Sequence, residues 1–180
     1  MRVLNVHERE LPTCSASAGA LIDALSSRSD ALWPKRSWPP MKLDAHLGVG
    51  AAGGHGPIRY FVEEYKPGQS IWFRFTGPKG FKGHHGFEVA QLGAQSCVLR
   101  HTLEMTTHGT AIVSWPLVFR PMHDALIEDG FAQAQASLGF DPFVRQWSFW
   151  VRILRSMISR GRSRAQTVPD VVPRTDSAVC

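Results

Sequence analysis

The stretch that decides the fold is KGHHGFEVAQL at residues 82–92, followed by GAQ at 93–95 and SCVLRHTLEMTT at 96–107. Both long runs alternate between apolar and polar residues, which is the pattern of β-strands with one buried face. A connection of three residues joins antiparallel neighbours, because parallel strands need a much longer crossover. The segment therefore predicts a long β-hairpin with one apolar face.

The register of this hairpin determines which side chains point inward. Pairing across the turn sets Phe87 opposite His101 and Val89 opposite Leu99, and it places His84 and His85 on opposite sides of their strand. The inner set then consists of His85, Phe87, Val89, Cys97, Leu99, His101, Leu103 and Met105.

Two histidines thus enter an otherwise apolar sheet face. His85 and His101 have three interpretations: core residues hydrogen-bonded to backbone, groups that orient a ligand's carbonyl or phenol, or an acid and base for proton transfer. The first is the commonest role of such residues, and the sequence leaves all three open.

Four more strands are expected around the hairpin, over residues 2–11, Met41–Leu47, Ile58–Tyr65 and Ser70–Thr76. The last two are joined by a short turn and are therefore antiparallel. Their registers place Tyr60, Phe73 and Phe75 on the face that carries Phe87. Such an aromatic stripe forms either plain core or the wall of a pocket for an aromatic or acyl ligand.

The segments between these strands predict helices and loops. Ser15 or Ser17 caps a helix with apolar positions from Ala18 to Leu25, and Asp30–Trp33 indicates a short helical turn that Pro34 closes. The glycine-rich segment Gly48–Pro57 is expected to be a loop.

After Gly109 the hydrophobic period becomes helical and continues to Leu138-Gly139. Pro116 and Pro121 should kink or delay this long helix. Asp124 and Glu128 are expected to face away from the core, with Asp124 paired to Arg120 on the solvent side. The expected inner face carries Trp115, Val118, Phe119, Met122, Leu126 and Gln133, with Ala125 and Asp129 at its edge.

Composition excludes several classes of protein. The 180 residues are 43% hydrophobic and 19% charged, which is a globular balance, and no run of 18 uncharged apolar residues suggests a transmembrane helix. The first residues lack a signal-peptide core, so we expect a cytoplasmic protein. Cys14, Cys97 and Cys180 form no CxxC pair and indicate reduced thiols.

The net charge of +5 is concentrated near the C-terminus. Residues 1–140 hold 13 Lys+Arg and 12 Asp+Glu, whereas residues 141–180 hold seven Arg and three Asp. A nearly neutral body argues against nucleic-acid binding, and a basic tail suggests an anionic partner.

No cofactor or metal site is predicted. The glycines at 48, 50 and 53 match GxGxxG, but a strand follows them where a dinucleotide site needs a helix N-terminus. His85, His101 and Asp129 could converge in principle, yet their surroundings are apolar and no tight ligand motif is present.

A basic amphipathic helix is expected over Phe143–Arg160, capped by Asp141 with Pro142 in the first turn. Its apolar face suits an anionic membrane surface, the protein's own body or a second copy in a homodimer. We assign residues 141–164 to this helix and expect 165–180 to be disordered. The side chains expected to face a membrane are Trp147, Trp150, Leu154, Arg152 and Arg155.

Three stretches of the sequence resemble one known group: GGHGPIRY at 53–60, FKGHHGFEV at 81–89, and WPL at 115–117 through HDAL at 123–126. They look like an actinobacterial branch of the START-like superfamily, also called the Bet v 1-like, SRPBCC, or polyketide cyclase/dehydrase and lipid-transport group. The resemblance covers roughly residues 2–138. It implies an α+β helix-grip fold over a domain of residues 1–140, with six to seven antiparallel strands wrapped around the long helix, and a hydrophobic ligand between sheet and helix.

The superfamily does not imply one reaction, since it includes carriers, cyclases and hydroxylase components. We expect binding or transport of a hydrophobic lipid or polyketide-like molecule, in the cytoplasm or at the inner membrane surface. The alternative is an aromatase/cyclase-like enzyme that uses the inward histidines for proton transfer. The expected cavity residues are Tyr60, Phe73, Phe75, His85, Phe87, His101, Leu103, Trp115, Met122, Leu126 and Asp129.

Overall fold

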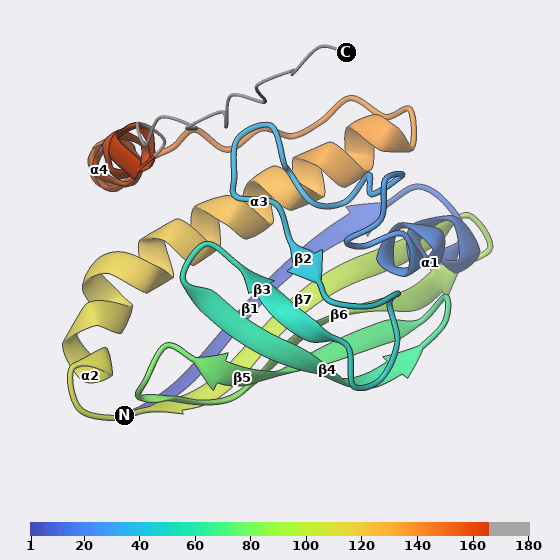
Figure 1. The fold of residues 1–180 in the computed structure, drawn as a ribbon. Coiled ribbons are helices and arrows are strands. Elements are labelled where there is room, and N and C mark those ends of the chain that lie inside the picture. The colour runs from blue at the N-terminus through green and yellow to red at the C-terminus, as the bar shows by residue number, and fades with distance from the viewer. Residues whose placement is uncertain (166–180) are drawn as a thin grey trace, which may run out of the picture. The chain divides into compact units, whose positions relative to one another are not determined.

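The computed structural model describes residues 1–165, and Figure 1 shows the course of the chain. One antiparallel sheet contains seven strands in the order β1-β7-β6-β5-β4-β3-β2. The strands are β1 (Arg2–Leu11), β2 (Lys42–Leu43), β3 (Ala52–His55), β4 (Ile58–Lys66), β5 (Ser70–Gly77), β6 (Phe81–Gly93) and β7 (Ser96–Thr107).

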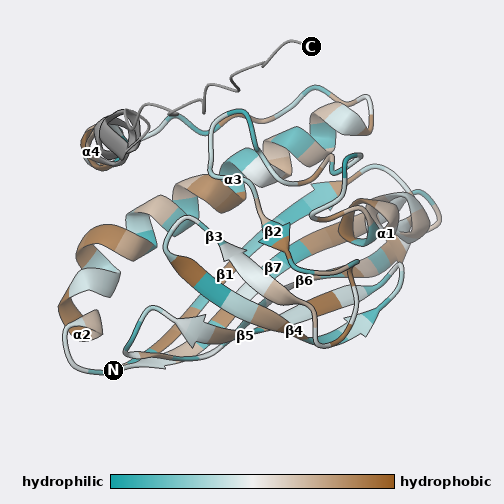
Figure 2. Ribbon diagram, in the orientation of Figure 1, coloured by the Kyte–Doolittle hydropathy of each residue, from teal (hydrophilic) through white to brown (hydrophobic). Residues whose placement is uncertain are grey.

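The helices complete an α+β helix-grip fold, as the sequence predicted. They are α1 (Ser15–Asp23), then α2 (Ala111–Ser114), the π-helix η1 (Trp115–Phe119) and α3 (Arg120–Ser137) in direct succession, and finally α4 (Phe149–Ala165). Figure 1 shows α3 lying across one face of the sheet, and Figure 2 shows hydrophilic and hydrophobic residues alternating along it. The chain divides into two compact units after Gln146.

The register predicted for the β6–β7 hairpin is confirmed. Phe87 pairs with His101, Val89 with Leu99, and Gln91 with Cys97. Tyr60 pairs with Phe75 between β4 and β5, and Phe73 pairs with His85 between β5 and β6, so the aromatic stripe shares one face as expected.

The loop expected at Gly48–Pro57 contains a strand instead. β3 pairs with β2 on one side and with β4 on the other, whereas the strand expected at Met41–Leu47 shortens to Lys42–Leu43. A Cβ atom on Gly53 would overlap the carbonyl oxygen of Lys42, so glycine lets these strands approach closely. The glycine content predicts a flexible loop, but in the structure these glycines allow β3 to pair with its neighbouring strands.

The structure corrects two expectations about helices, and local hydrogen bonds explain both. Asp30–Trp33 forms no helix, because the Asp30 carboxylate accepts hydrogen bonds from the backbone N–H groups of Leu32 and Trp33 in a turn. α4 begins at Phe149 rather than at Phe143, and Ser148 caps it by accepting the N–H of Val151. Asp141 and Pro142 lie in an irregular segment. The expectation of disorder at 165–180 concerns residues outside the described part, except for Ala165, which ends α4.

The expected kink of the long helix takes the form of the π-helix. The N–H of Arg120 reaches back to the carbonyl of Trp115, next to Pro121, which has no N–H to donate. This wider turn adds one residue to the helical repeat. The buried face of α3 is therefore carried by Leu126, Ile127, Gly130, Phe131, Ala132 and Ala134, whereas Met122 and Gln133 of the expected face are only half-buried.

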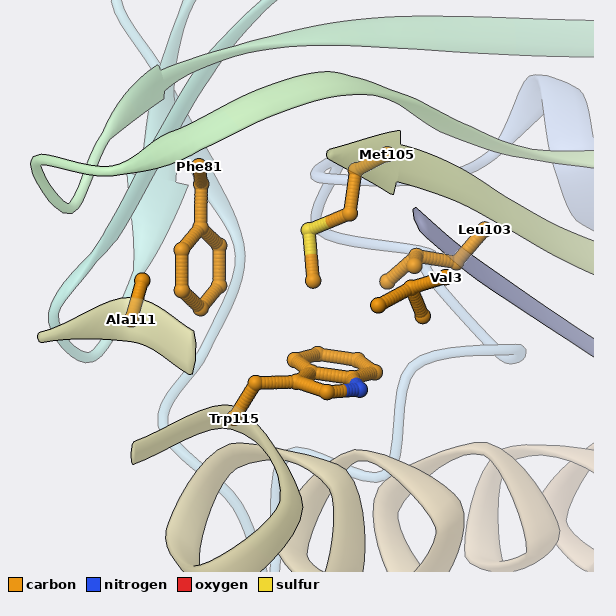
Figure 3. Packing of buried hydrophobic residues seen from close by; sticks show 6 residues of the cluster. All are labelled: Val3, Phe81, Leu103, Met105, Ala111 and Trp115. Carbon is orange, nitrogen blue, oxygen red and sulfur yellow. The ribbon is translucent and has the colours of Figure 1, made fainter. Parts of the chain in front are cut away.

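A compact hydrophobic cluster fixes the start of the long helix against the sheet. Trp115 packs there with Phe81 of β6 and with Leu103 and Met105 of β7 (Figure 3). Val3 and Ala111 complete the buried set, and the half-buried Phe75 and Phe119 pack against it. This cluster anchors η1 and so determines which α3 side chains face the sheet.

Candidate functional site: a row of interior histidines

The inner face of the sheet carries a connected row of polar aromatic side chains. The Nδ1 atom of His55 lies 3.0 Å from the Tyr60 hydroxyl, and the Tyr60 and His85 ring centroids are 5.0 Å apart. The His85 Nδ1 atom lies 3.4 Å from the His101 Nε2 atom. Four of these groups thus follow one another across β3, β4, β6 and β7.

Aromatic rings enclose the middle of this row. His85 stacks on Phe73 at 5.2 Å and on Phe75 at 4.8 Å, and Phe87 meets His101 edge to face at 4.7 Å. Phe73 and Phe87 are buried, as are His85 and His101, whereas Phe75 is half-buried. The predicted inward direction of both histidines is confirmed.

The long helix adds another histidine that the sequence analysis did not single out. The His123 ring centroid lies 5.0 Å from that of His101 and 5.9 Å from that of Trp115. On a helical wheel of 3.6 residues per turn His123 lies beside the expected inner face, and the π-helix rotates it further inward. The proline pair at 116 and 121 was the available signal for this shift.

At the far end of the row, His7 of β1 contacts acidic residues of α3. Its Nδ1 atom lies 2.8 Å from Glu128 Oε1, and its Nε2 atom lies 3.2 Å from Asp124 Oδ1. Arg9 donates to Glu128 Oε2 at 2.9 Å, and Asn5 donates to Asp124 Oδ1 at 2.9 Å. We call this polar contact between β1 and α3 the seam.

The seam overturns the expectation that Asp124 and Glu128 face away from the core. The Arg120 guanidinium does lie 3.7 Å from Asp124, but the main partners of that carboxylate are on β1. Alternate positions of β1, namely Asn5, His7 and Arg9, form the inward polar set. In the sequence, this recurrence of polar residues at every second position of β1 was the available signal. Their side chains meet Asp124 and Glu128, which lie one helical turn apart on α3.

Burial and charge set the protonation of these groups. Desolvation lowers the pKa of His85 and His101 well below its usual value, and the other interior histidines lower it further. Burial also lowers the pKa of His55 to about 3, lowers that of His123, and raises that of Tyr60. The middle of the row is therefore neutral at pH 7.

His7 behaves in the opposite way. Burial alone would lower its pKa, but the hydrogen bonds and negative charges of Asp124 and Glu128 outweigh burial and raise it. Burial works to raise the pKa of Asp124, but the neighbouring His123 ring and hydrogen bonds from His7 and Asn5 bring it below its usual range.

Several buried atoms of the row make no hydrogen bond with any residue in the described part of the chain. They are His85 Nε2, His101 Nδ1, both ring nitrogens of His123, and Asn5 Oδ1. An unsatisfied buried polar group costs about 1–3 kcal/mol, so such atoms concentrated in one place indicate a site prepared for another group.

The remaining predicted cavity residues do not all join this row. Leu103 and Trp115 belong to the cluster of Figure 3, Leu126 is buried, and Met122 is half-buried on α3. Asp129 does not converge with His85 and His101, because its carboxylate accepts a hydrogen bond of 2.7 Å from Trp38 Nε1. The group with metal-ligand spacing among the described residues is instead His7, His123 and Asp124.

In the second unit, the Arg155 guanidinium lies over the Trp147 ring at 4.5 Å. Trp150 and Arg152 are exposed, and Leu154 is buried. No helix within residues 1–165 combines the length and apolarity that crossing a membrane requires.

Comparison with known proteins identifies the fold. No protein-family model and no curated protein matches the sequence. Among solved structures, a Thermobifida fusca protein determined by NMR has a TM-score of 0.59 at 12% identity, covering 79% of this chain and 99% of that one.

Norcoclaurine synthase from Thalictrum flavum, solved in complex with dopamine and hydroxybenzaldehyde, has a TM-score of 0.57 at 15% identity, covering 77% of this chain and 88% of that one. CalU16 from Micromonospora echinospora has a TM-score of 0.51 at 11% identity, covering 91% of this chain and 96% of that one. The chain therefore has a Bet v 1-like fold, and the START-like resemblance seen in the sequence is confirmed at the level of fold.

Proposed function

We propose that the interior between the sheet and α3 binds a small, mostly apolar molecule that carries oxygen acceptors or hydroxyl groups, such as an aromatic or polyketide-like compound. The observation that supports this most strongly is the pair of unpartnered nitrogens, His85 Nε2 and His101 Nδ1, within aromatic walls. Each neutral imidazole has one donor nitrogen and one acceptor nitrogen. Because His85 and His101 contact each other through one nitrogen each, their two remaining nitrogens are one donor and one acceptor, which can orient a carbonyl or a phenol. Phe73, Phe75 and Phe87 would contact the apolar part of the ligand.

The fold comparison supports the same chemistry. Norcoclaurine synthase, with a similar fold, was solved with dopamine and hydroxybenzaldehyde, which are aromatic molecules with hydroxyl groups. A purely hydrocarbon ligand would leave the histidine nitrogens unsatisfied, and each such atom costs about 1–3 kcal/mol. The interior histidines therefore favour a ligand with polar groups over a simple acyl chain.

Native mass spectrometry of the purified full chain, followed by extraction of the retained molecule, tests this proposal. Rebinding of that molecule is then measured calorimetrically for His85→Phe, His101→Phe and His84→Phe. His84 is the matched control, because it lies on the opposite face of β6, where its ring meets Trp72 at 5.3 Å.

We expect His85→Phe or His101→Phe to weaken binding about fivefold to tenfold, the value of one hydrogen bond, and His84→Phe to leave it unchanged. Unchanged affinity in both interior variants would remove these histidines from the site. If no molecule is retained and an environment-sensitive dye such as anilinonaphthalene sulfonate does not bind, the carrier function fails.

A second candidate function is catalysis by proton transfer on the bound molecule, as in an aromatase or cyclase. The contact of 3.4 Å between His85 and His101, next to His123 and the carboxylate-bound His7, favours it, because neutral imidazoles can accept a proton. Incubating the extracted molecule's precursors with wild type and with His101→Phe distinguishes catalysis from binding. Conversion by the wild type alone supports an enzyme, and equal conversion by both excludes His101.

We further propose that α4 attaches the protein peripherally to anionic membranes. Phe149, Trp150 and Met157 are exposed, and Arg152 and Arg155 lie on the same helix, a composition typical of interfacial helices. Co-sedimentation with phosphatidylserine vesicles compares wild type with Phe149→Glu and with Val49→Glu, which places the same charge on an exposed residue of the first unit.

Binding that needs anionic lipid, weakens with salt and is lost only in Phe149→Glu supports attachment. If wild type does not sediment with these vesicles, α4 has another role. A concentration-dependent mass in light scattering would then indicate a homodimer.

A further inference from the structure

The seam contains three side chains whose donor atoms meet at one point. His7 Nε2 lies 3.2 Å from Asp124 Oδ1, and His123 Nδ1 lies 3.5 Å from the same oxygen. The donor atoms of these three residues all lie within 4.8 Å of one another. They come from β1 and from the start of α3, and the π-helix gives His123 its direction.

The two distances to Asp124, 3.2 Å and 3.5 Å, are close to the edges of a metal coordination polyhedron. Bonds of about 2.0–2.2 Å to nitrogen and carboxylate oxygen place tetrahedral ligands about 3.3–3.6 Å apart. Two imidazoles and one carboxylate suit borderline divalent ions such as Zn²⁺ and Co²⁺ more than Ca²⁺ or Mg²⁺, which prefer oxygen ligands alone.

The contacts around these ligands orient them toward that point. Glu128 Oε1 accepts from His7 Nδ1 at 2.8 Å, which orients the Nε2 atom toward Asp124. Such a carboxylate-to-histidine contact is the usual support of a metal-binding imidazole. Arg9 in turn holds Glu128 at 2.9 Å, and Asn5 holds Asp124 at 2.9 Å.

The hydrogen bonding of the site is incomplete. With its Nδ1 proton donated to Glu128, His7 needs a second proton on Nε2 to donate to the Asp124 oxygen. Within residues 1–165, neither ring nitrogen of His123 has a hydrogen-bond partner, and Asn5 Oδ1 beside Asp124 has none either. A cation at this point would take the place of the His7 Nε2 proton and would also satisfy one nitrogen of His123.

We propose that His7, His123 and Asp124 bind one divalent transition-metal ion of the Zn²⁺ class. Three protein ligands leave a coordination position for water or for an oxygen of a small molecule. Because His123 lies beside His101, with ring centroids 5.0 Å apart, this position belongs to the same row of groups as the ligand site proposed above. The metal site does not depend on that ligand site, since its donor atoms are separate.

Titration of tag-free, EDTA-treated and dialysed full-length protein with Co²⁺ tests the proposal. We expect one equivalent to bind, with visible absorption bands of Co²⁺ in a nitrogen and oxygen environment, and Zn²⁺ to displace it. Asp124→Asn and His123→Gln remove one ligand each, and His84→Gln is the control on the outer face of the sheet.

We expect both ligand variants to weaken Co²⁺ binding at least 100-fold, which exceeds the roughly tenfold to 100-fold effect of losing a supporting contact. His84→Gln should bind as wild type does. Absence of binding by wild type, or unchanged binding in both folded ligand variants, overturns the proposal and leaves a proton shared between His7 and the carboxylates at this point.

A measurement on wild type alone decides the matter if a variant does not fold. In ¹⁵N spectra of histidine-labelled protein, Zn²⁺ should shift the ring nitrogens of two histidines at one equivalent. Shifts in none of the interior histidines would overturn the proposal.

Discussion

His7 and His101 face each other across β1 and β7, yet their surroundings give them opposite chemistry. His7 lies against two carboxylates of α3 and its pKa is raised, whereas His101 lies among Phe87, His85 and His123 and its pKa is lowered. One sheet face therefore contains a charged seam and a neutral interior side by side. The difference shows that the side chains packed against each histidine, and not its strand position, decide its protonation.

Placing a charge in the neutral interior should have the largest effect. Leu103 of β7 is 1% exposed, so the carboxylate of Leu103→Asp would be buried in the apolar cluster without a cation. We expect a loss of about 5 kcal/mol or more, which is comparable with the whole stability of a typical domain. Thermal unfolding followed by circular dichroism measures it.

The control is Val6→Asp, which adds the same group to an exposed position of β1. This variant should lose less than about 1 kcal/mol. Equal stability of the two variants would mean that the interior is more accessible to water than its burial indicates.

Removing a charge from the seam should have the next largest effect. Glu128 and Arg9 have side chains that are 12% and 13% exposed, so Glu128→Gln leaves a nearly buried guanidinium without its carboxylate. Breaking a buried ion pair on one side costs about 3–5 kcal/mol, and we expect about 3 kcal/mol in urea denaturation at pH 7.

Glu8→Gln is the matched comparison on the outer face of the same strand. Glu8 contacts Arg100, which also binds Glu88, and the side chains of Glu8 and Arg100 are 49% and 37% exposed. This change should cost less than about 1 kcal/mol. A larger cost at Glu8 than at Glu128 would contradict the description of the seam as the buried charged region.

The sequence predicted the neutral interior better than it predicted the seam. The short turn at 93–95 fixes the register of β6 and β7. The inward direction of His85 and His101 then follows from the alternation of side chains along the two strands. The seam depends on a helix whose repeat changes at the π-helix. Counting 3.6 residues per turn through Trp115–Phe119 turns Glu128 away from β1.

His55 was missed for another reason. Its strand consists of Ala52, two glycines and His55, a composition that is typical of loops. β3 exists because β2 and β4 supply hydrogen-bond partners on both sides, which is tertiary information that a local pattern does not contain.

The pH dependence of stability sharpens the comparison further. The pKa of His85 is lowered by folding, so the native state binds fewer protons than the unfolded state below about pH 6.5. The titratable groups that act on His85 are Tyr60, His55, His84, His101 and His123, and none of them carries a negative charge at that pH. Above about pH 6.5 His85 is neutral in both states and does not lower the free energy of unfolding. As the pH falls, only the unfolded state takes up this proton, so the free energy of unfolding decreases.

For each proton taken up on unfolding, the free energy of unfolding falls by about 1.4 kcal/mol for every unit by which the pH decreases. Urea denaturation at pH 7.5, 6.5, 5.5 and 5.0 should accordingly show a shallower decline for His85→Phe than for wild type. His84→Phe should follow the wild-type slope. Parallel slopes in wild type and His85→Phe would mean that His85 is protonated in the folded state.

The smallest effect is expected at the edge of the neutral interior, where Tyr60 and His55 share a hydrogen bond of 3.0 Å. Burial keeps the Tyr60 hydroxyl protonated and His55 neutral, so the hydroxyl donates and Nδ1 accepts. Tyr60→Phe removes only this oxygen and should cost about 1 kcal/mol, since a neutral hydrogen bond contributes that much.

The matched change is Tyr65→Phe. The hydroxyl of Tyr65 donates to Asp23 at 2.9 Å in an exposed contact. In Tyr65→Phe, water can bind the Asp23 carboxylate that the hydroxyl leaves. This change should therefore cost less than Tyr60→Phe in the same urea titration. The reverse order would show that the neutral interior draws no stability from its hydrogen bonds, and the comparison with the charged seam would then rest on packing alone.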